Sequence, residues 1–275
     1  MKKRILALAA VAALALSVFA LGACSNQEDN SGEPQTADNA AAAAADNVLV
    51  VGFDPGQPPM GYTDESGNYV GFDIDLATEV ASRLGMELKL QPINWDAKQM
   101  EVESGNIDCI WNGFTIEGRE NDYTWSNPYM QNEQVFVVRA GSDIKTKEDL
   151  AGKTLAYQKD SSASAALEKN PEFMATLGNS TQTDTNLNAL LEVQTGSVDA
   201  ALLDSTMAEY NITRQGGQYE ILEEPLSAEN YGIGFKLGNT ELRDKVQGAL
   251  DAMVADGTFA TISNEWFGRD VSIKA

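Results

Sequence analysis

The sequence predicts an α/β fold in which parallel-rich sheets are flanked by helices. From residue 48 onward, short apolar runs of strand length alternate with amphipathic helical segments, an order typical of parallel α/β sheets. The same order begins again after residue 139, so the chain contains two similar units. Its 275 residues are enough for two ordinary domains, each with its own core.

The first unit begins with an apolar strand that runs into a segment rich in Pro and Gly, where no helix can continue. The next helix carries Asp73 and Asp75 in its first turn, where the helix dipole favours acids, and it ends at Gly85. The expected elements are a strand over 48–53, a hairpin turn within 62–70, a helix from 71, a strand over 86–93, a helix over 95–103 and a strand over 107–110.

The second unit follows a strand over 134–139 and repeats part of the first. Ser104–Ile110 and Thr195–Ala201 both read as a helix end, a glycine and an apolar strand with an aspartate. Counting five residues beyond each aspartate leads to Gly113 and to Asp204. The expected elements are a short helix opened by 146–149, strands over 153–159, 198–203 and 231–235, and helices over 160–170, 186–195 and 240–255, with a short final helix around 266–267.

Composition excludes several classes of function. The chain has 19 Lys+Arg against 41 Asp+Glu, a net charge of −22. Nucleic acid is therefore not expected as a partner, because binding to phosphates requires Lys and Arg. There is no histidine and there are two isolated cysteines, so we expect no metal site and no cofactor.

The N-terminal residues have the pattern of a secretory signal. Lys2, Lys3 and Arg4 precede an apolar segment rich in Ala and Leu, which is typical of a signal peptide. It ends in Leu21–Cys24, which resembles a bacterial lipobox, so residues 1–23 are interpreted as removed and Cys24 as lipidated. Plain signal cleavage or an uncleaved anchor are the alternatives. Residues 24–47 lack apolar periodicity and are expected to form a disordered acidic tether.

The clearest candidate for a binding site is Trp111–Arg119. A strand ends here and opens into Thr115, two glycines and Arg119. The ends of strands in open α/β sheets bind ligands, and an arginine there suits a carboxylate. The alternative interpretation is a surface loop with a solvated arginine.

Four segments resemble the family 3 extracellular solute-binding proteins, the capture subunits of polar amino-acid ABC importers. They are Gly71–Leu76, Trp111–Arg119, Trp125–Tyr129 and Val198–Asp204. The resemblance implies a two-lobed, type II periplasmic-binding-protein-like fold with the ligand in a cleft between the lobes. Lobe 1 would contain residues 48–132 and 231–275, lobe 2 would contain 133–230, and the crossings would lie near 130–135 and 226–231.

The resemblance also implies a role for each site residue. Arg119 and Thr115 would bind the α-carboxylate of an amino acid, together with the backbone N–H groups of Ser161 and Ser162 at a helix start. Asp204 would bind the α-ammonium group. The other implied contacts are a backbone carbonyl at Gly113, Asp54 in the side-chain pocket and Trp95 against the aliphatic part of the ligand, with Trp111 and Asn112 left open between site and packing.

Three positions depart from the family pattern. The loop between Gly113 and Arg119 is one residue shorter than the common form. Gln57 stands where many relatives carry an aromatic residue, and Asp160 replaces a common glycine before Ser161, which places a carboxylate near the expected carboxylate site.

The expected function is that of a monomeric capture lipoprotein, not an enzyme. It would be anchored on the extracytoplasmic face of the cell membrane, bind an L-amino acid by hinge closure and deliver it to an ABC permease. The alternative is a dehydratase on the same fold, with Asp54, Glu117 and Lys159 as candidate acids and bases; a receptor sensor domain is a third interpretation. Arginine, glutamine and cystine all remain open as ligands.

Overall fold

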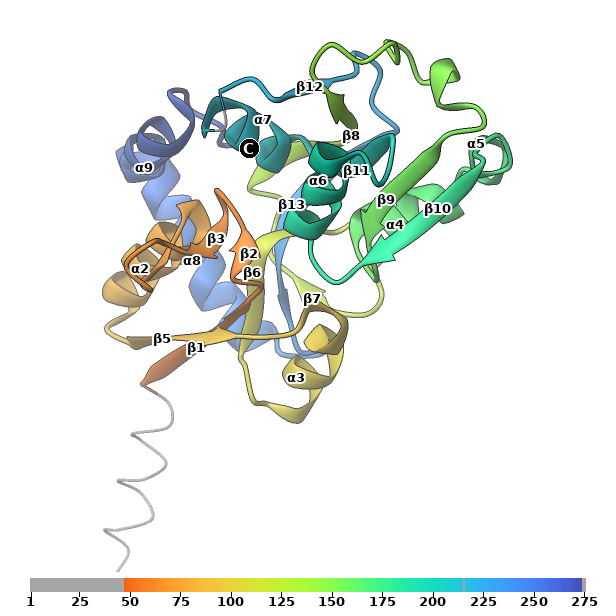
Figure 1. The fold of residues 1–275 in the computed structure, drawn as a ribbon. Helices are drawn as coiled ribbons and strands as arrows, with labels where there is room; N and C mark the ends of the chain where they lie inside the picture. Colours follow the sequence, from red (N-terminus) through yellow and green to blue (C-terminus); the bar gives the residue numbers. More distant parts are fainter. Residues whose placement is uncertain (1–46, 215, 274–275) are drawn as a thin grey trace, which may run out of the picture. The chain divides into compact units, whose positions relative to one another are not determined.

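The computed structural model describes residues 47–214 and 216–273. The signal segment, Cys24 and nearly all of the tether lie outside these residues. The described part is an α/β fold with a ten-stranded mixed sheet and a three-stranded antiparallel sheet (Figure 1). None of its helices is both long and apolar enough to cross a membrane.

The large sheet has the strand order β10-β9-β11-β8-β13-β6-β1-β5, with β12 beside β8 and β7 beside β13. Its first half contains β1 (Val48–Phe53), β5 (Glu87–Pro92), β6 (Cys109–Thr115), β7 (Thr124–Trp125) and β13 (Ser227–Phe235). Its second half contains β8 (Met130–Arg139), β9 (Thr154–Gln158), β10 (Asn179–Thr183), β11 (Ala200–Asp204) and β12 (Tyr219–Ile221). The small sheet contains β2 (Gly56–Gln57), β3 (Gly61–Thr63) and β4 (Tyr69–Val70).

Helices accompany both halves of the large sheet. Those of the first half are α2 (Phe72–Leu84), η1 (Trp95–Ala97), α3 (Lys98–Ser104), α8 (Thr240–Asp256) and α9 (Thr258–Phe267). Those of the second half are η2 (Glu148–Leu150), α4 (Ser162–Glu168), α5 (Pro171–Met174), α6 (Asn186–Thr195) and α7 (Ser205–Arg214). Each half has two apolar clusters of buried side chains, which the helices complete.

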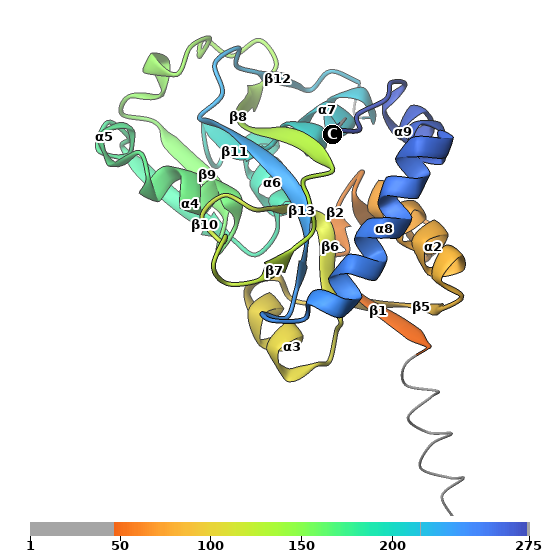
Figure 2. The same ribbon diagram turned by 180° about the vertical axis from the view of Figure 1, so that it is seen from behind.

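The two halves have the same strand arrangement. In the first, β1 lies between β5 and β6, and all three are parallel. In the second, β9 lies between β10 and β11 in the same way. The antiparallel strands β13 and β8 follow β6 and β11, and they pair with each other over Ser227–Tyr231 and Met130–Gln134 (Figure 2). The sequence predicts two separate sheets. Because β8 and β13 pair, the two halves instead form one continuous sheet.

The repeat seen in the sequence corresponds to two equivalent helix-to-strand connections in the structure, residues 105–108 and 196–199, which we call joints. Gly105 and Gly196 end α3 and α6 in the left-handed conformation, with φ of 80° and 79°. The carboxylate of Asp108 then accepts the N–H of Val50 at 2.7 Å, and that of Asp199 accepts the N–H of Thr154 at 2.8 Å. Each aspartate therefore fastens the start of the third strand of its unit to the first strand.

Candidate functional site

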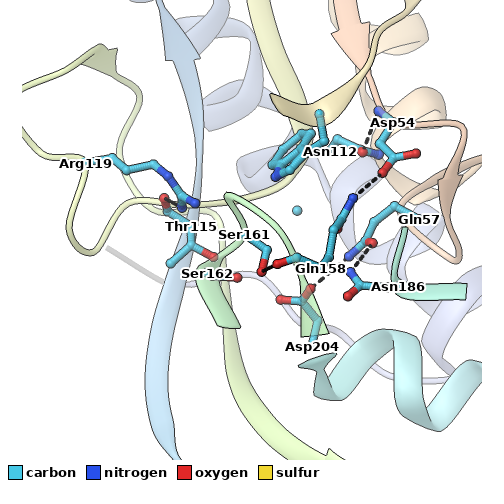
Figure 3. A pocket seen from close by; sticks show the side chains of 12 residues that line it. Asp54, Gln57, Asn112, Thr115, Arg119, Gln158, Ser161, Ser162, Asn186 and Asp204 are labelled. Atoms are coloured by element: carbon cyan, nitrogen blue, oxygen red, sulfur yellow. Dashed lines mark hydrogen bonds between the residues drawn. The ribbon is translucent and has the colours of Figure 1, made fainter. Parts of the chain in front are cut away.

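One cavity is lined by every residue to which the sequence analysis assigns a ligand contact. It comprises about 300 Å³ of atom-free space, which includes its opening to solvent. Figure 3 shows side chains from both halves of the sheet pointing into it. The lining residues are Asp54, Gln57, Trp95, Asn112, Gly113, Thr115, Arg119, Gln158, Ser161, Ser162, Asn186 and Asp204.

Arg119 is placed by the loop that follows β6. Its own backbone carbonyl accepts the indole N–H of Trp125 at 3.0 Å, which fixes the loop. The guanidinium donates to the carbonyl of Thr115 at 3.2 Å and lies 5.2 Å from the centre of the Phe114 ring. Burial lowers the pKa of Arg119 from its usual value, yet an arginine remains cationic at every physiological pH. The shorter loop therefore still brings this charge to the cavity.

Asp160 lies next to Arg119 and directly before Ser161, and it has a left-handed conformation with φ of 52°. This conformation favours glycine, which accounts for the glycine in the family pattern. The side chain of Asp160 is exposed. Its backbone carbonyl accepts Lys98 Nζ at 3.0 Å and Arg119 Nη2 at 3.3 Å. The carbonyl oxygen of Asp160 thus accepts hydrogen bonds from two cationic side chains of the first half of the chain.

Ser161 and Ser162 begin α4 beside this carbonyl. Ser161 is the N-cap: its hydroxyl accepts the N–H of Ser164 at 3.2 Å and donates to the carbonyl of Gln158 at 2.6 Å. The hydroxyl of Ser162 accepts Gln134 Nε2 at 3.0 Å. The start of this helix therefore borders the cavity near Arg119, where positive potential would favour an anion.

Asp204 is the last residue of β11 and is 5 % exposed. Its Oδ1 accepts Asn132 Nδ2 at 2.9 Å, Gln134 Nε2 at 2.8 Å and the hydroxyl of Tyr231 at 2.9 Å. Its Oδ2 accepts Gln57 Nε2 at 2.9 Å. Four uncharged donors satisfy this carboxylate, so the negative charge has no ion-pair partner among the described residues.

Gly113 is held in the cavity wall by the buried Asp73 of α2. The backbone N–H of Gly113 donates to Asp73 Oδ2 at 2.6 Å, and the hydroxyl of Tyr129 donates to the same carboxyl group at 2.9 Å. Burial raises the pKa of Asp73 to about 7. The position favours glycine, because φ is 57° and an added Cβ would lie 3.1 Å from Met60 Cγ and 3.2 Å from the ring of Tyr231.

Asp54 lies at the other end of the cavity among amides. Its carboxylate accepts the N–H of Gly56 at 2.8 Å and Gln158 Nε2 at 3.0 Å. Burial raises the pKa of Asp54. Gln57 Oε1 accepts Asn186 Nδ2 at 3.0 Å, so this end of the cavity is polar where many relatives carry an aromatic residue.

Two lining residues, Gln158 and Asn186, were not predicted from the sequence. Gln158 is a polar residue at the end of the apolar strand β9, and that irregularity was a usable signal. Asn186 follows the N-cap Thr185 of α6 and resembles any helix start. Among the described residues, three buried side-chain atoms that belong to lining residues have no hydrogen-bond partner: Asn112 Nδ2, Thr115 Oγ1 and Asn186 Oδ1.

Trp95 packs its ring edge-to-face on Phe114, with centroids 5.4 Å apart, and borders the cavity. Trp111, by contrast, is fully buried in the core next to Tyr129 and is not part of the lining. The structure therefore separates two residues of one motif: Trp111 packs beneath the site, and Asn112 lines it.

The candidate acids and bases of the dehydratase alternative do not all share one cavity: a neighbouring cavity is lined by Asp54 and Lys159 but not by Glu117. Glu117 accepts the backbone N–H and the amide of Asn230, at 2.9 and 2.7 Å. Lys159 forms ion pairs with Asp96 and Asp184 at 2.9 and 3.2 Å. Of the three candidates, only Asp54 lines the cavity shown in Figure 3.

Comparison with known proteins gives the same picture. Residues 49–269 match the bacterial extracellular solute-binding proteins, family 3. The chain belongs to this family. It is similar to the L-cystine-binding protein TcyA of Bacillus subtilis, with 32 % identity over 99 % of this chain and 100 % of that protein. It is also similar to the L-cystine-binding protein TcyJ of Escherichia coli, with 29 % identity over 82 % of this chain and 84 % of that protein.

A solved structure shows the same fold. It is an ABC uptake transporter substrate-binding protein from Streptococcus pneumoniae with bound histidine. The TM-score is 0.82 and the sequence identity is 36 %, over 87 % of this chain and 100 % of that one. The type II, two-lobed α/β fold expected from the sequence is thus confirmed at the level of the whole family domain.

Proposed function

We propose that this protein is the capture subunit of an amino-acid ABC importer and that it binds an L-amino acid as a zwitterion. The observation that supports this most directly is the charge pattern of the cavity. Arg119 and Asp204 come from different halves of the chain and line one cavity. Opposite charges at opposite walls suit a carboxylate and an ammonium group, each of which needs a partner when it leaves water.

In this proposal Arg119, Thr115, Ser161 and Ser162 bind the α-carboxylate. Asp204 and the carbonyl of Gly113 bind the α-ammonium group. The side chain of the amino acid lies between Asp54 and Trp95. The polar contacts of Asp54, Gln57 and Gln158 favour a side chain with hydrogen-bond donors, such as that of arginine or glutamine.

Binding would act by closure of two lobes, residues 48–132 with 231–275 and residues 133–230. Hydrogen bonds already join the two across the cavity, from Gln57 to Asp204 and from Gln158 to Asp54. A ligand that contacts both sides adds affinity for this closed form and shifts the population towards it. The closed monomer would then dock on a membrane permease, with lipidated Cys24 and the tether 24–47 holding it on the extracytoplasmic face.

Calorimetry with the twenty amino acids and L-cystine tests the proposal. We expect one or a few of them to bind tightly at one site per chain and to be recovered unchanged. The relatives were found with histidine bound or are named for cystine, so those two belong in the panel beside arginine and glutamine. Absence of binding across the panel would refute the proposal, and chemical conversion of a bound amino acid would favour the dehydratase alternative.

A further inference from the structure

A second buried carboxyl group lies next to Asp204, outside the ligand cavity. Glu229 on β13 is 5 % exposed. Asn132 Nδ2 is 2.7 Å from Glu229 Oε1 and 2.9 Å from Asp204 Oδ1. Gln134 Nε2 is 2.9 and 2.8 Å from the same two oxygens. Each amide therefore donates to both acids.

Among the described residues, neither acid of this pair has a positively charged ion-pair partner that would neutralise a second carboxylate. No ion pair reaches either acid within the described part of the chain. Two carboxylates that share a buried site repel each other, so one of them keeps its proton. The titratable groups facing the pair from neighbouring elements are Tyr231 on β13, Glu133 on β8, Glu209 on α7, Arg269 after α9 and Arg119 from the loop after β6.

Glu229 is the acid that holds the proton. Burial, followed by the negative charge of Asp204, raises the pKa of Glu229 to about 8. Asp204 accepts four hydrogen bonds, whereas the two that Glu229 accepts come from amides shared with Asp204. Hydrogen bonds to the charged form stabilise it, so these contacts support a carboxylate at Asp204 more than one at Glu229.

We propose that Glu229 is a positioning residue that is a neutral acid beside Asp204 in the empty cavity and releases its proton when an amino acid's ammonium group binds Asp204. This inference rests on the proposed function. The arriving cation offsets the charge of Asp204 and so favours the carboxylate form of Glu229. The O–H bond of Glu229 breaks, its electron pair stays on the carboxylate, and the proton leaves to solvent.

The structure provides a path for this proton. Glu229 also lines a second cavity, which is open to solvent and shares no lining residue with the ligand cavity. This cavity is lined by Gln131, Asn132, Glu133, Ser205, Glu209, Ala228, Glu229, Asn230 and Arg269. A proton can therefore leave Glu229 through the second cavity while the ligand occupies the first, which Asp204 lines.

The sign of the pH dependence follows from linkage. A group whose pKa falls on binding makes affinity rise with pH, until the pH passes the pKa of the free protein. For Glu229 the affinity rises up to about pH 8 and then stops rising. The slope is at most roughly tenfold in the binding constant per pH unit, because one proton is released.

Calorimetry in buffers of different ionisation enthalpy measures this proton directly, with L-arginine and L-glutamine as probes. For the wild type at pH 7 we expect release of up to about one proton per amino acid bound. Glu229→Gln keeps the size and the hydrogen-bonding capacity of a neutral acid, so we expect it to bind at pH 6 within about threefold of the wild type and to release fewer protons. By pH 8 the wild type should bind at least tenfold more tightly than the variant. Because both proteins use the same probe, the titration of the amino acid itself cancels.

Equal proton release and parallel pH profiles in the two proteins would overturn the inference while leaving the proposed function intact, whereas no binding of any amino acid would refute the proposed function itself.

If Glu229→Gln does not fold, infrared difference spectra provide the test. The spectra would be recorded on the Asp73→Asn variant, because Asp73 is another buried acid with a raised pKa and would add its own protonated-carboxyl band. Loss of a protonated-carboxyl band on addition of L-arginine is expected, and persistence of all such bands would contradict the inference.

Discussion

The two halves of the sheet share one scaffold and differ in the charge that each brings to the cavity. Both contain the same three parallel strands and the same joint, in which Asp108 or Asp199 fastens the third strand to the first. In the first half a loop then leads to the cation Arg119. In the second half the strand itself ends at the anion Asp204. The repeated residues thus build the scaffold, and the residues that differ after the joint bear the function.

The halves also differ in how they support the cavity wall. In the first, the carboxyl group of Asp73 holds the backbone of Gly113. In the second, amides from β8 hold the carboxylate of Asp204. An acid supports a neutral group on one side, and neutral groups support an acid on the other. Of these two acids, Asp73 and Asp204, only Asp204 lines the cavity.

The largest expected effect comes from removing the charge of the second half. Asp204→Asn should weaken amino-acid binding by roughly 30-fold to several thousand-fold, because truncating one partner of a buried charge pair costs about 2–5 kcal/mol. Calorimetry on the variant measures the loss. Asp143→Asn, an exposed acid of the same half, is the matched control and should bind like the wild type. Equal affinity of both variants would show that Asp204 does not bind the ligand.

The support in the first half predicts a pH effect on stability. The pKa of Asp73 is raised to about 7, so between roughly pH 4 and 7 the folded protein binds a proton that the unfolded chain lacks. This contribution is fully present below pH 4 and is lost as the pH rises to 7. Urea unfolding should therefore show wild-type stability falling relative to Asp73→Asn by about 2–4 kcal/mol across that range. Parallel pH profiles would contradict the assignment.

The two joints predict a pair of smaller effects. Asp108→Ala and Asp199→Ala each remove the acceptor of one strand N–H, so both should lower the free energy of unfolding by about 1 kcal/mol. The first should cost more, since Asp108 is half-buried and Asp199 is exposed. Neither side chain lines the cavity, and the affinity for amino acids should stay within twofold of the wild type. A large loss of affinity in either variant would show that the joint contributes to ligand binding as well as to stability.

Asp160→Gly is expected to have the smallest effect. Glycine relieves a left-handed conformation but adds entropy to the unfolded chain. The net gain in the free energy of unfolding should be between zero and about 1 kcal/mol. Affinity should not change, because the carbonyl that meets Lys98 and Arg119 belongs to the backbone. Destabilisation, measured in urea, would show that the carboxylate of Asp160 contributes to the fold.

Much of the fold was readable in the sequence because its elements have strong local signals. The α2 helix, the hairpin of β3 and β4 and the glycines that end α3 and α6 all lie where the patterns placed them. The β10 strand was missed because Asn179–Thr183 has no apolar residue. The α7 helix was missed because it follows β11 without a loop, so no turn residue marks its start.

The cavity was only partly predictable for a different reason. The residues carried over by resemblance lie in motifs with fixed spacing, and the structure brings them together. Gln158, Asn186 and Glu229 are placed by pairing between distant strands and halves, so nothing local indicates which polar group they face. The proximity of Glu229 to Asp204 depends on the register of β8 with β13, which a sequence does not specify.

The measurement that most directly tests the central claim is the affinity of Arg119→Ala for the amino acid that binds the wild type. The claim is that the two halves bind the two ends of one zwitterion. The variant should fold with wild-type stability within about 1 kcal/mol and lose roughly 30-fold or more in affinity, whereas Arg83→Ala, an arginine outside the cavity, should not lose affinity. Wild-type affinity in a folded Arg119→Ala protein would contradict the account.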